Sequence, residues 1–390
     1  MSSDDPMEKK IYALGSGQAR SLRDLLDYFA TRGTMRVSDL HLKVGVPPVY
    51  RVDGLLRPIE GPPLDAPTAE ALVSSFLTEL EIGKLREVGS VETSCMTDKL
   101  QFRVNCFRDN DGFAAAVRAL ENRIPAVEKI GFPNAVWRDI LDMQQGLVLL
   151  TGITGAGKST TIASLIDRIA RDSACRIITL EDPIEYLLEN KSCMIEQREI
   201  GSDCPTFASG LRHALRQDPD IILVGEMRDL ETTSSTITAA ETGHLVLSTL
   251  HTVNAPQTIE RIIDIYPASQ QNQIRAMLAN TLQAVISQTL FRRVDKPGMV
   301  PCTEILLCTS AVRNCIRENR IYEIPNIIET SRRLGMQSMD FSIQQQYEAD
   351  YIDREEAVTR SSNPGKMDKL LAHKDLSRTA GSKEKAKVIS

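Results

Sequence analysis

The segment 152–159, Gly-Ile-Thr-Gly-Ala-Gly-Lys-Ser, fits the phosphate-binding pattern G-x-x-x-x-G-K-[ST]. Its glycines allow backbone N–H groups to surround phosphate oxygens, and a helix that begins near Lys158 adds the partial positive charge of its N-terminus. We expect Lys158 to reach the β- and γ-phosphates, and the Ser159 hydroxyl to bind Mg²⁺. A buried-strand run over 146–150 precedes the pattern, which is the order that a phosphate loop needs. The predicted nucleotide-binding residues are Gly152, Ile153, Thr154, Gly155, Ala156, Gly157, Lys158, Ser159 and Thr160.

A phosphate loop also needs a second acidic group for the metal and a group that positions the attacking water. In a parallel sheet such groups lie at the carboxyl ends of the strands. Asp220 precedes the strand-like run 221–224, so it lies about 13 Å from that edge, at ~3.3 Å per residue. Glu226 follows the same run, and we therefore predict that Glu226 and Ser159 bind the metal.

Further carboxylates, among them Glu181 and Glu185, follow the strand-like run 176–180 at the same predicted edge. Pro183 stiffens this loop, and we expect it to direct Glu185 toward an attacking water. The alternative for each of these carboxylates, and for Glu226, is that it caps a helix.

Two histidines flank the strand-like run 245–249. His251 follows the run and is predicted to lie near the γ-phosphate. His244 precedes the run, so a straight strand places it roughly 20 Å away. His244 is therefore expected to pack, or to face a neighbouring subunit.

Two arginines are predicted to face each other in an antiparallel hairpin over 100–120. Asp109-Asn110-Asp111-Gly112 is the turn signal, and pairing about its tip places Arg103 opposite Arg118. Like charges directly opposite are destabilising, so this pair suggests an anion between or near the two guanidinium groups. The alternative is that the register separates them and both are solvated.

The elements around these residues change in kind along the chain. Residues 1–20 are polar and are predicted to form a loose leader. Residues 21–122 are predicted to form a smaller α+β domain. Short strands are expected at 39–44 and 49–52, with a hairpin turn at Asp53-Gly54. One helix is expected from the spacing of Leu22, Leu25, Leu26 and Phe29, and another over 67–86.

After a predicted linker at 123–134, continuous Val/Ile/Leu runs alternate with helical segments. This alternation is typical of a parallel sheet that is covered on both faces. We expect one such α/β domain over 135–360 and a disordered basic tail over 361–390. The strands of that domain are predicted at 146–150, 176–180, 221–224 and 245–249. Its helices include those predicted at 268–291, 310–318 and 337–349.

Composition excludes several classes of protein. The chain has 390 residues, of which 42% are hydrophobic and 25% charged, an ordinary globular composition with room for two domains. No apolar run approaches the ~18 residues that a membrane-spanning helix needs. The cysteines include no Cys-x-x-Cys pair for a structural zinc, and a net charge of −6 lacks the basic footprint of nucleic-acid-binding proteins. We expect a reduced cytosolic protein that binds no nucleic acid.

Taken together, these motifs resemble those of the GspE/PulE family of type II/IV secretion and pilus ATPases, and most closely its PilT/PilU-type retraction ATPases. The similarity runs from about Ser38 to about Asp353. Residues 38–54 are similar to the family's PAS-like N-terminal domain. Residues 179–185 match the family's Asp box, and residues 225–229 match its Walker B motif. Residues 238–252 match the His box, and residues 311–318 match the AIRNLIRE segment of the retraction ATPases.

The resemblance implies a RecA-like P-loop NTPase core, with a smaller PAS-like α+β N-terminal domain. It also implies a homohexameric ring that binds ATP and Mg²⁺ between the two domains. Such a ring hydrolyses ATP to retract type IV pili, the basis of twitching motility. It lies in the cytoplasm, peripheral at the inner membrane, where its partners are the pilus platform protein and the rest of the pilus machinery.

The same resemblance assigns roles to individual residues. It implies that Glu185 is the catalytic base and Glu226 the Walker B carboxylate. Arg103 and Arg118 fall where the family has its phosphate-sensing arginines, and His244 counts as part of the His box.

Three alternatives remain open at this point. The first is a pilus extension or type II secretion ATPase with the same chemistry, against which the segment 311–318 and the missing tetracysteine zinc element argue. The second is a nucleic-acid translocase on the same core. The third is a nucleotide-binding regulator that does not turn over ATP.

Overall fold

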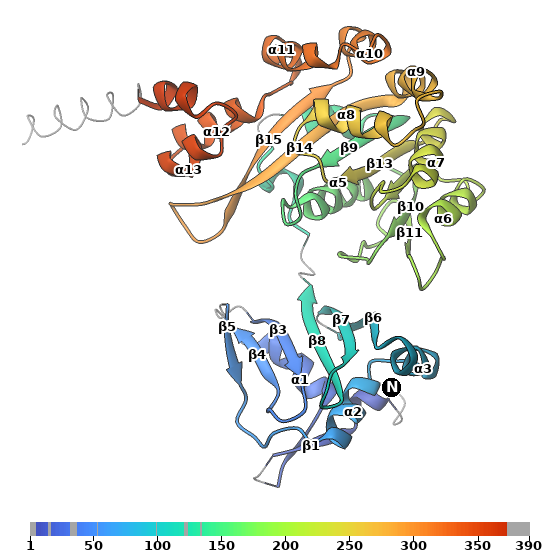
Figure 1. Ribbon diagram of the computed structural model, residues 1–390, viewed down its shortest axis with the longest axis vertical. Helices are drawn as coiled ribbons and strands as arrows, with labels where there is room; N and C mark the ends of the chain where they lie inside the picture. The colour runs from blue at the N-terminus through green and yellow to red at the C-terminus, as the bar shows by residue number, and fades with distance from the viewer. Residues whose placement is uncertain are drawn as a thin grey trace, which may run out of the picture. The chain divides into compact units, whose positions relative to one another are not determined.

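The chain divides into two compact units, residues 1–123 and 124–390. Both mix helices with strands, and the second holds a sheet whose strands are mostly parallel (Figure 1). The predicted fold class, a large α/β core with a smaller α+β domain, is confirmed. The computed structural model describes residues 5–14, 17–31, 37–52, 54–98, 100–120, 124–132 and 135–372.

The first unit is built on an antiparallel sheet with the strand order β5-β4-β3-β8-β7-β6. Helices α1, α2 and α3 pack their leucines on it, and Leu25, Leu72 and Leu85 are fully buried there. The strands predicted over 39–44 and 49–52 are confirmed. The elements are α1 (Leu22–Thr31), β3 (Val37–Leu42), β4 (Val49–Val52), β5 (Leu55–Pro58), α2 (Ala66–Ser74), α3 (Glu79–Val88), β6 (Ser90–Met96), β7 (Gln101–Arg108) and β8 (Phe113–Leu120).

The hairpin predicted over 100–120 has the expected register. β7 and β8 pair from Gln101 opposite Leu120 to Arg108 opposite Phe113. Arg103 therefore stands directly opposite Arg118. The Asp109 side chain stabilises the turn by accepting hydrogen bonds from two backbone N–H groups of the tip.

The single helix predicted over 67–86 is wrong, because the chain forms α2 and α3 with a break between them. Thr78 caps the start of α3 by accepting from the Glu81 N–H, and the Glu81 carboxylate accepts from the Thr78 N–H in return. This capping box starts a new helix. The spacing Thr-x-x-Glu was the signal that the periodicity argument overlooked.

The loose leader predicted for residues 1–20 is also wrong where the structure describes it. A short helical turn, η1 (Pro6–Glu8), precedes an antiparallel pair formed by β1 (Lys10–Ala13) and β2 (Ala19–Ser21). Tyr12 is only 1% exposed and belongs to the hydrophobic core of the first unit. Burial of this ring orders the segment; residues 1–4, 15 and 16 lie outside the described residues.

The second unit holds a sheet with the order β11-β10-β12-β13-β9-β14-β15. Its strands are parallel except for β15, which pairs antiparallel with β14. The runs predicted at 146–150, 176–180, 221–224 and 245–249 are its central strands, whereas β11, β14 and β15 were not predicted. The strands are β9 (Gly146–Thr151), β10 (Arg176–Glu181), β11 (Met194–Glu199), β12 (Ile221–Val224), β13 (Leu245–Leu250), β14 (Leu282–Arg292) and β15 (Met299–Leu307).

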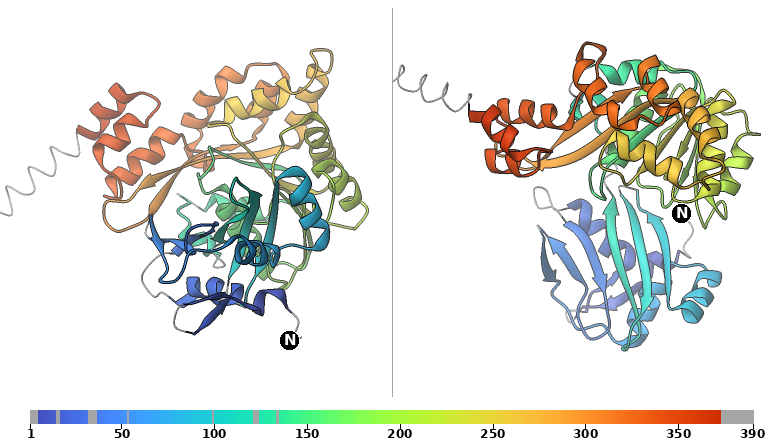
Figure 2. Two further views of the ribbon diagram at one scale, coloured as in Figure 1. Left: turned by 60° about the horizontal axis from the view of Figure 1, so that its bottom comes forward. Right: turned by 45° about the horizontal axis from the view of Figure 1, so that its top comes forward.

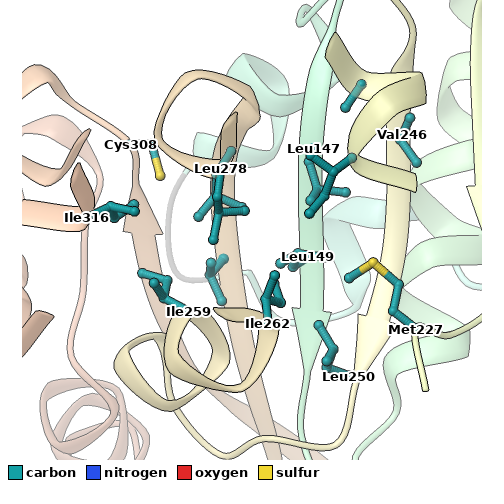
Figure 3. Packing of buried hydrophobic residues seen from close by; sticks show 14 of the residues in the cluster. Leu147, Leu149, Met227, Val246, Leu250, Ile259, Ile262, Leu278, Cys308 and Ile316 are labelled. Carbon is teal, nitrogen blue, oxygen red and sulfur yellow. The ribbon is translucent and has the colours of Figure 1, made fainter. Parts of the chain in front are cut away.

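Helices cover both faces of this sheet. Leu147 and Leu149 of β9 point to one face and belong to a hydrophobic cluster to which helices α6 to α11 also contribute residues (Figure 3). Val148 and Leu150 point to the other face and pack against α4 and α5. The helices are α4 (Val136–Leu141), α5 (Lys158–Asp172), α6 (Phe207–Ala214), α7 (Leu230–Glu241), α8 (Ala255–Asp264), α9 (Gln271–Thr281), α10 (Ser310–Arg317) and α11 (Ile324–Thr330).

The long helix predicted over 268–291 is wrong. Helix α9 ends at Thr281, and the chain continues directly into β14, which lies beside β9. Leu282 has the extended backbone of a strand, at φ −64° and ψ 126°. An apolar run is compatible with either element, and here pairing with a central strand decides between them.

The C-terminal part of the second unit extends past the predicted boundary at 360. The far ends of β14 and β15 pack against α12 (Met339–Glu348) and α13 (Arg354–Thr359) (Figure 2). Residues 364–372 are helical, and Met367 and Leu371 are buried in the same cluster. The disordered tail is therefore wrong for 364–372, while 373–390 lie outside the described residues.

The segment predicted as a linker, 123–134, is not wholly a connection. Val127, in the short helical turn η2 (Val127–Lys129), is 1% exposed and packs in the core of the second unit. Its burial against α4 and α5 adds this turn to that unit. Residues 121–123, 133 and 134 lie outside the described residues.

Candidate nucleotide site

The phosphate loop lies between the end of β9 and the start of α5, as its sequence predicts. Gly152, Gly155 and Gly157 have positive φ values of 145°, 80° and 85°, a backbone region that favours glycine. A Cβ atom on Gly152 would meet the Gln288 carbonyl oxygen at 2.4 Å. The loop therefore folds closely against β14, with its open side at the N-terminus of α5.

Lys158 is 8% exposed and closes the loop on itself. Its Nζ donates to the carbonyl oxygens of Gly152, at 2.7 Å, and Ile153, at 3.2 Å. Burial lowers the pKa of Lys158, and the negative charges of Glu185 and Glu226 partly offset this effect. Both predicted carboxylates thus act electrostatically on the ammonium group of the phosphate loop.

Glu226 follows β12, and its side chain is 12% exposed. One carboxylate oxygen lies 3.2 Å from His251 Nε2, and the other contacts the Arg228 guanidinium. The Thr249 hydroxyl donates to the Gly225 carbonyl at 2.6 Å and fixes the chain just before Glu226. His251 thus contacts the Glu226 carboxylate at this edge of the sheet.

Glu181 and Glu185 follow β10 but have different surroundings. Glu185 is exposed, and its charge reaches Lys158. Glu181 accepts hydrogen bonds from the Thr179 hydroxyl, at 2.6 Å, and from the Gln197 amide, at 3.0 Å. Burial raises the pKa of Glu181. Of the two, Glu185 is the one open to a substrate.

The structure places His244 and Asp220 at the opposite edge of the sheet. His244 precedes β13, and its Nδ1 lies 3.0 Å from the Ala239 carbonyl oxygen at the end of α7. Asp220 precedes β12 and accepts from the Arg176 N–H at 2.8 Å. The phosphate loop is not their neighbour, and the His244 ring instead contacts the end of α7.

Sequence reasoning missed the side chains that support the loop from β14. The Gln288 amide donates to the Ala156 carbonyl at 2.8 Å, and its Oε1 accepts from the Thr161 hydroxyl at 2.9 Å. The Ser287 hydroxyl accepts from Thr151 at 2.9 Å. The adjacent polar residues Ser287 and Gln288 within the apolar run 282–292 were the available signal. They were overlooked because the run was predicted to be helical.

A second contact supports the loop from the segment that carries Glu185. The hydroxyl oxygens of Thr160 and Tyr186 lie 2.8 Å apart. Because Tyr186 directly follows Glu185, this contact joins α5 to the backbone that positions the carboxylate.

Arg103 and Arg118 belong to the first unit, whereas the phosphate loop belongs to the second. Each guanidinium has a carboxylate partner within the first unit. Arg103 lies 3.1 Å from Glu92, and Arg118 lies 2.8 Å from the buried Asp39. A carboxylate from a neighbouring strand thus balances each of the two facing charges.

The donor set at this edge suits Mg²⁺, because the Ser159 hydroxyl and the Glu226 carboxylate are oxygen ligands, the kind that this ion prefers. Within the described part of the chain, no group of three or more His, Cys, Asp and Glu side chains is arranged to hold a metal ion.

A comparison with known protein families identifies the family of this chain. A family model described as type II/IV secretion system protein matches residues 34–364. The chain belongs to this family. The match spans the six-stranded sheet of the first unit and the seven-stranded sheet of the second, and it includes the phosphate loop, Glu185, Glu226 and α10.

Individual members of the family agree with this assignment. The type IV pilus retraction ATPase PilT of Pseudomonas aeruginosa is 41% identical over 344 residues, which cover 88% of this chain and 98% of that protein. A twitching motility protein of Neisseria gonorrhoeae is 40% identical over 321 residues, which cover 82% of this chain and 86% of that protein. The retraction-type resemblance of the sequence is confirmed.

Solved structures support the fold. The crystal structure of the pilus retraction motor PilT with bound ADP superposes with a TM-score of 0.81 at 40% identity, covering 88% of this chain and 97% of that chain. The ATPase DotB of Legionella pneumophila superposes with a TM-score of 0.76 at 27% identity, covering 86% and 93%. The second unit is therefore a RecA-like P-loop core.

Helix α10 carries the segment that resembles the retraction members. Arg313 is turned inward and donates to the carbonyl oxygens of Ala279, Asn280 and Cys308. Arg317, one turn later, is exposed. Among the helices of the described residues, none combines the length and the apolar character needed to cross a membrane.

Proposed function

We propose that this chain is the subunit of a hexameric motor that hydrolyses ATP to drive type IV pilus retraction. The proposal rests on the family membership and on the similarity to PilT across nearly the full length of that protein. It also places the motor in the cytoplasm, bound to the inner membrane through the pilus platform protein.

The hydrolysis step follows from the side chains at the sheet edge. Water attacks the γ-phosphate in line with the bond to the leaving oxygen of ADP. Glu185 is the base that accepts the proton of this water, because it is exposed while its charge reaches Lys158. Lys158 leaves its present carbonyl partners to bind the phosphate oxygens.

Mg²⁺ would neutralise charge on the phosphate oxygens, with Ser159 and Glu226 as the residues that hold it. His251 contacts Glu226 and would orient that carboxylate. Arg103 and Arg118 would stabilise the charge that develops on the phosphates during the transfer. Both arginines must then exchange their present carboxylate partners for phosphate oxygens.

One observation carries the chemical part of this proposal: β10 and β12 pair in parallel with Leu180 beside Val224, so Glu185 and Glu226 both follow strands that end at the edge where the phosphate loop follows β9. The test is ATP hydrolysis by Glu185→Gln. We expect turnover to fall by about 10³-fold or more while ATP binding is retained, since the substitution removes the base but keeps its shape. Full activity in this variant would remove Glu185 from the mechanism.

The biological part requires a separate test. Pilus retraction force is measured in a retraction-deficient deletion strain that carries this chain, with Glu185→Gln as the matched inactive control. We expect the wild-type chain to restore retraction and the variant to fail. Restored pilus extension without retraction would instead support an assembly ATPase of the same family.

A further inference from the structure

The first unit contains a cavity of about 880 Å³ that is separate from the nucleotide site. All of its lining residues lie between Leu14 and Pro62, whereas the phosphate loop belongs to the second unit. The walls come from the β1–β2 pair, α1, β4, β5 and the segment 59–62. The volume is within the range of pockets that hold small ligands.

Hydrogen bonds between the segments that form the walls hold them in place. The Tyr12 hydroxyl, on β1, donates to the Pro62 carbonyl at 2.7 Å. A Cβ atom on Gly61 would come within 2.2 Å of the same hydroxyl oxygen, so glycine permits this close approach. The Ile59 N–H donates to Pro48 at 3.0 Å. The cavity is therefore preformed, and the N-terminal segment builds one side of it.

Two arginines, Arg20 and Arg57, line this cavity together with Tyr50. Arg57 stands directly opposite Tyr50 in the pairing of β4 and β5. Burial raises the pKa of Tyr50, and the charge of Arg20 opposes this rise, so Arg20 also lies close to the ring. Both arginines line the cavity, together with a single carboxylate, Glu60.

Neither guanidinium has an ion-pair partner among the described residues. Other arginines of the same unit do, as Arg86 shows with Glu70 at 3.1 Å and Arg103 with Glu92 at 3.1 Å. Two unpaired like charges at one cavity favour an anion, because guanidinium groups bind phosphate oxygens in a two-pronged geometry.

An aromatic surface lies beside these charges. The rings of Tyr28 and Tyr50 stack with centroids 4.4 Å apart and an angle of 27° between their planes. The Tyr50 hydroxyl is fixed by donation to the Leu25 carbonyl at 2.7 Å. Tyr28 and Tyr50 both line the cavity, so they give it an aromatic wall that a planar ring of a ligand can contact.

We propose that the cavity binds a phosphorylated ring compound of the nucleoside monophosphate class, with its phosphate between Arg20 and Arg57 and its ring against Tyr28. This site is distinct from the phosphate loop, because all of its lining residues belong to the first unit and the loop belongs to the second. It gives the N-terminal domain a ligand of its own.

The test is equilibrium dialysis of the full chain with radiolabelled 5′-AMP, in saturating ADP and Mg²⁺ so that the phosphate loop is filled. We expect one AMP per chain. Arg20→Ala and Arg57→Ala should each weaken its binding by about tenfold or more. Arg86→Ala, an exposed arginine of the same unit, is the matched control and should bind AMP as the wild type does.

Further measurements make the outcome decisive. Ribose 5-phosphate lacks the ring, and we expect it to bind about tenfold more weakly than AMP. Lys158→Ala should keep AMP binding, and Arg20→Ala should keep basal ATP hydrolysis. The proposal is overturned if AMP fails to bind at millimolar concentration, or if its binding depends on Lys158 and not on the two arginines.

Discussion

Glu181 and Glu185 are acidic residues of one short segment, yet their surroundings separate their chemistry. Glu181 is enclosed, accepts from Thr179 and Gln197, and has a pKa that burial raises. Glu185 is exposed and acts on Lys158. Burial makes the charged form of Glu181 costly, whereas the exposed Glu185 side chain is accessible to a substrate.

Glu181→Gln should raise the stability of the protein at pH 8. The pKa of Glu181 is higher in the folded than in the unfolded state, so the wild type loses stability as the pH rises from about 4.5 through the raised value. Glutamine keeps an Oε1 acceptor and has no charge to bury. Urea unfolding at pH 4 and pH 8 measures the difference, which should grow with pH. Glu189→Gln, exposed in the same loop, is the control; equal gains in both variants would contradict this reasoning.

Gln288→Leu should weaken the phosphate loop. The substitution leaves the Ala156 carbonyl and the Thr161 hydroxyl without their buried partner, at a cost of about 1–3 kcal/mol. We expect lower urea stability and a higher Kd for ADP, as measured by calorimetry. Gln344→Leu, which removes an exposed contact with Glu348, should change neither quantity. Unaltered ADP affinity in Gln288→Leu would show that the loop holds its shape without β14.

Sequence patterns predicted those residues whose chemistry is local. The glycines and Lys158 occupy one continuous segment, and the strand-end rule separated Glu226 from Asp220 without any structure. Gln288 could not be found in this way, because its role depends on β14 lying beside β9. No spacing along the chain encodes that contact.

At the scale of elements, α10 has one arginine that stabilises the fold, Arg313, and one that is exposed at the surface, Arg317. Arg313 binds the carbonyl oxygens of Ala279 and Asn280 at the end of α9, and it also contacts the Gln283 amide oxygen at 2.9 Å. These carbonyls have no partner within α9, so the guanidinium caps that helix where it turns into β14. Arg317 is exposed and free of this task.

Arg313→Ala should therefore destabilise the protein, by about 2–3 kcal/mol, since several charge-assisted hydrogen bonds are lost. Arg317→Ala should change stability by no more than about 0.5 kcal/mol. Urea unfolding of the two variants tests this contrast. Arg317→Ala is the better variant for a retraction assay. Because it should remain stable, a loss of retraction would indicate a lost surface contact and not unfolding. Equal stability of both variants would contradict the capping role.

The helix at 364–372 offers a second test at this scale. Leu371 is 1% exposed and packs in the cluster with Phe291, whereas its neighbour Leu370 is 42% exposed. Leu371→Ala should lower the unfolding free energy by about 2–4 kcal/mol. Leu370→Ala should lower it by at most about 0.5 kcal/mol. Identical unfolding curves for the two variants would place this helix outside the folded unit.

Elements were predictable where one local pattern dominated. The continuous apolar runs of β9, β10, β12 and β13 have few alternatives in a sheet that is buried on both sides. The run at 282–292 fits a helix as well as a strand, and only its neighbour β9 decides. Residues 10–13 are too few for periodicity to detect, yet the single ring of Tyr12 orders them.

At the scale of the whole molecule, the proposed motor divides its catalytic groups between two units. Lys158, Glu185 and Glu226 belong to the second unit, and Arg103 and Arg118 to the first. The facing arginines were predicted from their spacing about a turn. Their carboxylate partners were not, because Asp39 and Glu92 come from the neighbouring strands β3 and β6.

Arg118→Ala provides the test of this division. If Arg118 exchanges Asp39 for phosphate oxygens during hydrolysis, kcat should fall by about 10³-fold while ATP binding and thermal stability stay close to the wild type. Arg51 also contacts Asp39, at 3.7 Å, so Arg51→Ala removes a comparable ion pair and should leave kcat unchanged. Phosphate release and calorimetry measure both quantities. Equal losses of kcat in the two variants would mean that the Asp39 cluster acts through the fold of the first unit, and that Arg118 never reaches the nucleotide.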